Sequence, residues 1–136
     1  MSVAANRWLG RALLASSIAL SAAGQLGMKA GMQELHALAA RGVVLVTAPW
    51  SDLAPAVEWT SAGLTAYGLS LLCWLAVLVR YPLSYAYPLL GLAYVLVYVG
   101  ATQWPRLAES ASVLRTAGTL LILAGVALVT LADRRR

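Results

Sequence analysis

The sequence has few charged side chains. Only 11% of its 136 residues are charged, whereas 61% are hydrophobic. A folded domain of this length leaves much of its surface exposed, and this composition offers too little polar surface to cover it. The scarcity of charge therefore excludes an ordinary soluble domain and indicates a chain whose solvent is lipid.

Cysteine and histidine occur once each, as Cys73 and His36. A single cysteine excludes an internal disulfide, and a lone histidine without ligand-spaced partners is weak evidence for a metal site. We therefore expect no metal site. The net charge is +5, but a chain made mostly of apolar segments leaves no folded basic surface for nucleic acid. The terminal Arg134–Arg136 is therefore interpreted as a topology signal and a contact for lipid headgroups.

Long apolar runs account for most of the chain. A spanning helix needs roughly 20 mostly apolar residues, and the sequence predicts one all-α membrane domain, residues 1–136, built as a bundle of four transmembrane helices. The helices are expected at about Trp8–Met28, Trp59–Val79, Leu83–Ala101 and Leu114–Ala132. A cleaved signal peptide is the alternative for the first run, but that run is long and regularly interrupted by polar residues.

The connections between these helices differ in length. The first, residues 30–58, is long; its beginning, "GMQELHALAAR", is expected to extend the first helix, and Pro49 is expected to end any helix there. The second, "RYP", is so short that helices two and three should be antiparallel neighbours.

The distribution of Lys and Arg predicts the orientation. Six of them fall on the side of the two termini and four on the other side, which favours a cytoplasmic N-terminus and C-terminus (N-in/C-in) under the positive-inside rule. An antiparallel homodimer, in which the two protomers have opposite orientations, requires nearly equal numbers of Lys and Arg on the two sides of the membrane. We therefore expect a fixed orientation, with either a homologous small subunit (a heterodimer) or a parallel homodimer as the assembly.

The first helix carries two stripes with a period of four residues. They lie two positions, or about 200°, apart and so occupy nearly opposite faces. Small residues let another backbone approach, whereas a polar stripe should face a cavity or a partner, since lipid would leave it unpaired. The alternative is that the serines bond their own helix and that Gln25 bonds a neighbouring one. The small stripe is Ala15, Ala19, Ala23, Gly27 and Gly31; the polar stripe is Ser17, Ser21, Gln25 and Lys29.

The third helix contains an internal proline beside several tyrosines. Pro82 suits a helix start, but Pro88 removes a backbone hydrogen bond and predicts a kink, with Gly91 one turn further on. Tyr87 and Tyr94 lie deep enough in the predicted span to need hydrogen-bond partners; packing and an interfacial belt are the alternative for tyrosines of this helix. In the fourth helix, Gly118 and Gly125 with their neighbouring alanines predict a packing or dimerisation face.

Three segments, "LSAAGQLGMKAG", "PLSYAYPLLGLAYVLVY" and "ESASVLRTAGTLLILAGVALV", resemble the small multidrug resistance superfamily. The resemblance covers all four helices and is strongest to the lipid-sugar branch, the small subunits of the aminoarabinose-phosphoundecaprenol flippase (ArnE and ArnF). The long first connection, "LSLLCW" and "AYVLVY" are more similar to the F subunit. Its pattern runs from Ser21 to Lys29, through Ala86-Tyr87-Pro88, to Glu109 nine residues before Gly118.

Two departures separate the chain from drug-exporting members of the superfamily. They carry a membrane-embedded glutamate where this chain has Ser21, and a tryptophan where it has Leu90. Half of the aromatic cage for cations is therefore expected to be missing. No Asp or Glu lies in the central part of any predicted helix, which argues against proton-coupled drug export. The lipid-sugar branch lacks the same acid.

The resemblance implies a flippase subunit that moves an undecaprenyl-phosphate-linked amino sugar across the bacterial inner membrane, for lipid A modification and polymyxin resistance. Such transport implies no covalent chemistry, so no cofactor and no enzyme activity are expected. Lys29, or Arg7 and Arg11 on the cytoplasmic side, is expected to meet the phosphate. Glu109 is expected to meet the ammonium group or to hold a loop arginine. The alternatives are a small multidrug or guanidinium-type cation exporter and a non-transporting subunit that scaffolds a glycosyltransferase. The residues expected to line the sugar path are Ser21, Gln25, Tyr87 and Tyr94.

Overall fold

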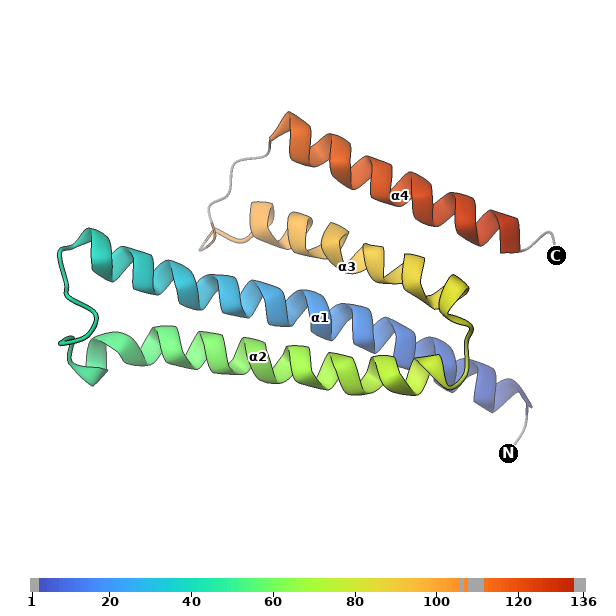
Figure 1. The fold of residues 1–136 in the computed structure, drawn as a ribbon, viewed down its shortest axis with the longest axis horizontal. Coiled ribbons are helices and arrows are strands. Elements are labelled where there is room, and N and C mark those ends of the chain that lie inside the picture. Colours follow the sequence, from blue (N-terminus) through green and yellow to red (C-terminus); the bar gives the residue numbers. More distant parts are fainter. Residues whose placement is uncertain (1–2, 106, 108–111, 134–136) are drawn as a thin grey trace.

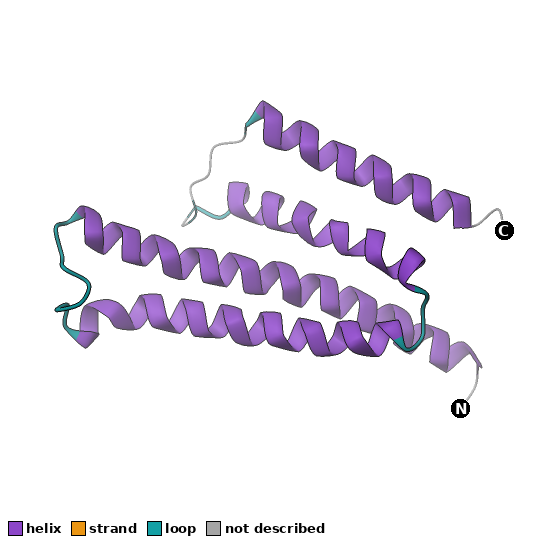
Figure 2. Ribbon diagram, in the orientation of Figure 1, coloured by secondary structure: helices purple, strands orange, loops and turns teal. Residues whose placement is uncertain are grey.

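A computed structural model describes residues 3–105, 107 and 112–133 of the chain. Four helices account for most of this part, and it contains no strand (Figure 2). Glu109 and the side chain of Arg7 lie outside what is described. The helices are α1 (Val3–Ala40), α2 (Trp50–Leu78), α3 (Leu83–Gln103) and α4 (Val113–Asp133).

The helices stand in a row rather than in a square bundle. In Figure 1 the order across the molecule is α2, α1, α3 and α4, and both termini lie at the same end. The contacts agree with this view: α1 packs extensively on α2 and less on α3, while α4 touches only α3 among the described helices. The expectation that helices two and three are close neighbours is therefore wrong. The short connection 79–82 passes α3 across to the far side of α1, so that α2 and α3 barely touch.

Two predicted boundaries are corrected by the structure. The first helix continues to Ala40, and the second begins at Trp50 rather than at Trp59. The predicted extension of the first helix is thus confirmed, but the connection spans only residues 41–49 instead of 30–58. Pro49 precedes α2 and Pro55 lies inside it, so proline begins this helix rather than ending one. The 38 residues of α1 extend over roughly 57 Å, well beyond the roughly 30 Å of a hydrocarbon core.

A seam of glycines holds α1 against α2. A methyl group added at Gly63 would lie 2.5 Å from the backbone nitrogen of Met28 and 2.7 Å from the carbonyl oxygen of Gly24. Gly27 and Gly31 also lie close against α2, Gly27 with 3.0 Å from its methyl position to Gly63 Cα and Gly31 against Thr60. Backbones approach this far only where side chains are absent. The seam therefore uses Gly24, Gly27 and Gly31. The predicted stripe is corrected at its first three positions, because Ala15, Ala19 and Ala23 are exposed.

A compact apolar cluster joins α1 to α3 near the α1–α2 loop. Ala30, Ala101 and Leu107 are almost fully buried there, with Leu26 and the Trp59–Trp104 pair packed around them. The two indole rings meet edge to face, with centroids 5.4 Å apart. Gln33 donates a hydrogen bond from Nε2 to the carbonyl oxygen of Leu107 at 2.9 Å. Leu26 also fills the space beside Gly100. This end of the α1–α3 contact is closed.

The third helix is continuous through Pro88. It begins after Pro82, whose φ of −63° is the angle that the proline ring imposes, and runs unbroken to Gln103. A kink at Pro88 stays a prediction. Gly91 faces α4, where a methyl group would lie 3.1 Å from Ile122, and the hydroxyl of Tyr98 shares a 2.6 Å hydrogen bond with Thr116.

Three described helices, α2, α3 and α4, are long and apolar enough to cross a membrane. The chain is therefore a multi-pass membrane protein. α1 does not reach the same apolarity, since its polar stripe interrupts the apolar run. On α4, methyl groups at Gly118 and Gly125 would meet nothing, so this face is open in the single chain and its role in dimerisation remains a prediction.

Candidate functional site

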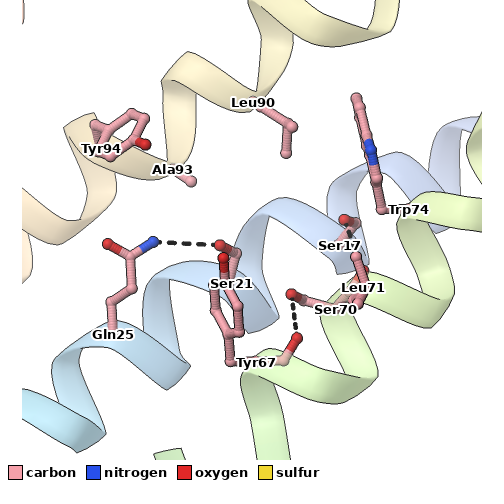
Figure 3. Close-up of a pocket in the computed structure, with 10 residues that line it drawn as sticks. All are labelled: Ser17, Ser21, Gln25, Tyr67, Ser70, Leu71, Trp74, Leu90, Ala93 and Tyr94. Carbon is pink, nitrogen blue, oxygen red and sulfur yellow. Dashed lines mark hydrogen bonds between the residues drawn. The ribbon is translucent and has the colours of Figure 1, made fainter. Parts of the chain in front are cut away.

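A polar cavity lies between α1, α2 and α3. Its volume is about 130 Å³, and Figure 3 shows its lining. Both helices of the tightly packed α1–α2 pair contribute polar side chains, and α3 supplies the opposite wall. The lining consists of Ser17, Ser21 and Gln25 from α1, Tyr67, Ser70, Leu71 and Trp74 from α2, and Leu90, Ala93 and Tyr94 from α3.

Hydrogen bonds fix the floor of the cavity. Ser17 Oγ donates to the carbonyl oxygen of Ser70 at 3.0 Å and so ties α1 to α2. Ser70 Oγ donates to the carbonyl oxygen of Tyr67 at 2.6 Å. Both serines are buried, so their hydroxyls are used within the protein, as buried polar groups require.

Groups higher in the cavity remain available to a ligand. Gln25 Nε2 donates to Ser21 Oγ at 3.3 Å, which directs the amide nitrogen along its own helix; the amide oxygen lies on the side away from Ser21 (Figure 3). Within the described part of the chain, no hydrogen bond engages the hydroxyls of Tyr67 and Tyr94. An amide, a hydroxyl group and phenols can together donate and accept several hydrogen bonds.

The cavity carries no formal charge on any described side chain that lines it. The described residues also contain no group of three His, Cys, Asp or Glu that would hold a metal ion. Neutral hydrogen-bonding groups between aromatic rings can bind an uncharged polar ligand with apolar faces. They offer neither a counter-charge for a buried cation nor a titratable relay for protons.

The sequence was compared with those of known proteins. It is 42% identical over 125 residues to a protein of Shewanella sediminis named "Probable 4-amino-4-deoxy-L-arabinose-phosphoundecaprenol flippase subunit ArnF", covering 88% of this chain and 86% of that one. Proteins with the same name from Serratia proteamaculans (41% identical, 88% and 91% covered) and Aeromonas hydrophila (42%, 83% and 74%) are similar to it as well. The chain belongs to the ArnF family. No family model and no solved structure matches it.

Three of the residues predicted to bind the ArnF-type substrate come together, and the others do not. Ser21, Gln25 and Tyr94 line the cavity. Tyr87 and Lys29 do not line it, and Tyr87 is largely exposed. Arg11 is an exposed residue of α1 outside the cavity. The predicted roles of Glu109 and Arg7 fall on parts of the chain that are not described.

The wall that α2 contributes was not predicted from the sequence. Tyr67, Ser70 and Trp74 follow one another at spacings of three and four residues, which places them on one helical face. That spacing, in a segment otherwise rich in leucine, was the available signal. Trp74 lies near Leu90 in the lining of the cavity (Figure 3), so α2 supplies an indole ring there although α3 has none at Leu90. The absence of half of the aromatic cage for cations stays a prediction.

Proposed function

We propose that the chain is a subunit of a flippase that moves an undecaprenyl-phosphate-linked amino sugar of the aminoarabinose type across the inner membrane. The observation that carries the proposal is the uncharged polar cavity, found in a chain that matches ArnF proteins over most of its length. A sugar ring presents hydroxyl groups at its edge and C–H groups on its faces. Ser21, Gln25 and Tyr94 suit the edge, and Trp74 suits a face. The ammonium group of the sugar needs a carboxylate outside this uncharged cavity, and Glu109 is the candidate that the sequence offers.

The proposal includes α1 as a fourth spanning helix. Its polar residues Ser17, Ser21 and Gln25 face the cavity rather than lipid, so their low apolarity does not oppose insertion. The orientation follows the distribution of Lys and Arg, with both termini in the cytoplasm. In this proposal Lys29, or Arg7 and Arg11 on the cytoplasmic side, meets the lipid phosphate near an end of the span.

Neither alternative gains support from the site. A cation exporter needs a buried acid, and none of the described side chains around the cavity is acidic. A scaffold subunit predicts a polar stripe that lines no cavity, whereas three members of the stripe line this one. Proton release on adding quaternary ammonium ions to the purified protein is the result that would favour the exporter.

Reconstituted flipping of an aminoarabinose-linked undecaprenyl phosphate tests the function, with two tyrosines as a matched pair. Tyr94 lines the cavity and Tyr87 does not, although both lie on α3 with similar exposures of 62% and 66%. Loss of one hydrogen bond between neutral groups is worth about 0.5–1.5 kcal/mol. We therefore expect Tyr94→Phe to slow flipping roughly 2- to 13-fold and Tyr87→Phe to leave it unchanged. Equal rates for both variants and the wild type would remove Tyr94 from the path.

The predicted assembly has its own test. A heterodimer with a homologous small subunit, or a parallel homodimer, requires one orientation in the membrane. Single cysteines placed at each terminus in a Cys73→Ser background are expected to react with a membrane-impermeant maleimide only after the cytoplasmic side is opened. Equal labelling from both sides of intact cells would contradict the fixed orientation.

A further inference from the structure

A second hollow lies along the α1–α2 pair, toward its loop. It measures about 340 Å³ and is almost entirely apolar. Unlike the polar cavity, it has no wall from α3 among the residues that line it, so it is an open groove. Its lining consists of Met32 and Leu35 from α1 and Ala56, Val57, Thr60, Ser61 and Leu64 from α2.

The groove and the cavity lie on the same side of the α1–α2 pair. Three pairs of lining residues on α2 are each fourteen positions apart, which is close to four helical turns and returns to the same face. Ser21 of the cavity and Leu35 of the groove show the same separation on α1. The α2 pairs, groove residue first, are Ala56 and Ser70, Val57 and Leu71, and Thr60 and Trp74.

An apolar edge connects the two hollows. Val57 and Leu64 line the groove, and Leu71, one heptad further along α2, lines the cavity. Beneath this edge the Gly24–Gly63 contact closes the seam between the helices. A chain-like apolar ligand whose polar end lies in the cavity therefore has a continuous apolar surface to follow.

The groove crosses the expected boundary of the hydrocarbon core. Glu58 and Arg80 bracket the apolar part of α2, which at 1.5 Å per residue covers roughly 30 Å. The groove extends from Ala56 to Leu64, on both sides of the level of Glu58. Met32, Val57 and Leu64 are exposed there, and apolar surface beside headgroups and water is stabilised when an apolar chain covers it.

We propose that the groove binds the prenyl chain of the lipid whose sugar occupies the polar cavity. This inference rests on the proposed function and adds a second subsite to it, specific for the chain rather than the sugar. The polar cavity binds the sugar, the Val57–Leu64–Leu71 edge guides the first isoprene units, and the groove holds the units that follow. The subunit thereby selects a long prenyl chain.

Leu64→Trp fills the groove, and Leu72→Trp is its matched control. Both leucines lie on α2 with nearly equal exposures of 61% and 62%, but Leu72 lines neither hollow. Flipping is measured for two lipids with the same sugar phosphate, one carrying an undecaprenyl chain and one a dimethylallyl group, a single isoprene unit that is too short to reach Leu64. Each displaced methylene group is worth roughly a fourfold change. We expect Leu64→Trp to raise KM for the undecaprenyl lipid about fourfold or more, with the dimethylallyl lipid and Leu72→Trp unaffected.

Other occupants of the groove predict other results. If an ordinary membrane lipid or nothing fills it, Leu64→Trp behaves like Leu72→Trp with both lipids. If a partner subunit fills it, Leu64→Trp impairs both lipids equally and weakens association of the subunits. Either result overturns the proposal. If the wild type flips no lipid, the proposed function fails by itself; undecaprenyl phosphate with a photoactivatable group on its chain then decides the groove, since it must label Met32 or Leu35 in the wild type and lose that labelling in Leu64→Trp.

Discussion

Gln25→Leu is expected to reduce flipping of the aminoarabinose-linked lipid about 10- to 100-fold. The amide lines the cavity and donates to Ser21, whereas leucine of similar size offers no hydrogen bond. A sugar hydroxyl that loses its partner costs about 1–3 kcal/mol, and Ser21 loses its partner as well. The measurement is the initial rate in proteoliposomes at matched protein content.

The control for this variant is Gln103→Leu. Gln103 is the exposed last residue of α3 and is remote from the cavity, so the same chemical change there should leave the rate within twofold of the wild type. Because Gln25 is only half-buried, its replacement by leucine should also leave thermal stability nearly unchanged. A normal rate for Gln25→Leu would mean that the substrate does not pass through this cavity.

Gly63→Ala should strongly destabilise the packing of α1 on α2. The added carbon would lie 2.5 Å from Met28 N and 2.7 Å from Gly24 O. Both are backbone atoms, so only a shift of one helix relieves the contact. Overpacking of this kind costs about 1–3 kcal/mol. Unfolding of the purified protein by SDS, followed by circular dichroism, should show the loss.

Gly68→Ala provides the comparison on the same helix. A methyl group there meets nothing within 4 Å, and alanine is the better helix former. We expect this variant to be neutral or slightly more stable than the wild type. If the two alanine variants unfold alike, the close approach of α1 and α2 at Gly63 is not formed in the protein.

The helices and part of the site follow directly from the pattern of the sequence. Ser21 and Gln25 were predicted to face a cavity because lipid gives such side chains no partner, and the structure places both at one. The cavity is short, however, and its α3 wall extends only from Leu90 to Tyr94. Tyr87 lies two turns from Tyr94 and so falls beyond its end, a length that no periodicity encodes.

Other features depend on which neighbour a helix meets. The close seam uses Gly24, Gly27 and Gly31, which are three and four residues apart, as in packed helix pairs. A strict period of four residues instead includes the exposed alanines of α1 and leaves Gly24 out. From the sequence alone, Trp74 is typical of a tryptophan at the membrane interface. Only the structure shows that Leu90 of α3 lies near it at the cavity. The position of α3 on the far side of α1 depends on the path of the four-residue connection before it. The sequence of α3 itself does not determine that path.

The row of helices has a mechanical consequence. Glycine contacts lock α1 to α2, and α4 is attached to the rest only through α3, so the chain consists of two hairpins joined by the contact of α1 with α3. The polar cavity lies at that junction, with its floor on one hairpin and its opposite wall on the other. A rocking of one hairpin against the other can therefore change access to the cavity while both tightly packed pairs stay intact. Alternating exposure of a sugar to the two sides of the membrane then requires no helix to unfold and no buried hydrogen bond of the α1–α2 seam to break.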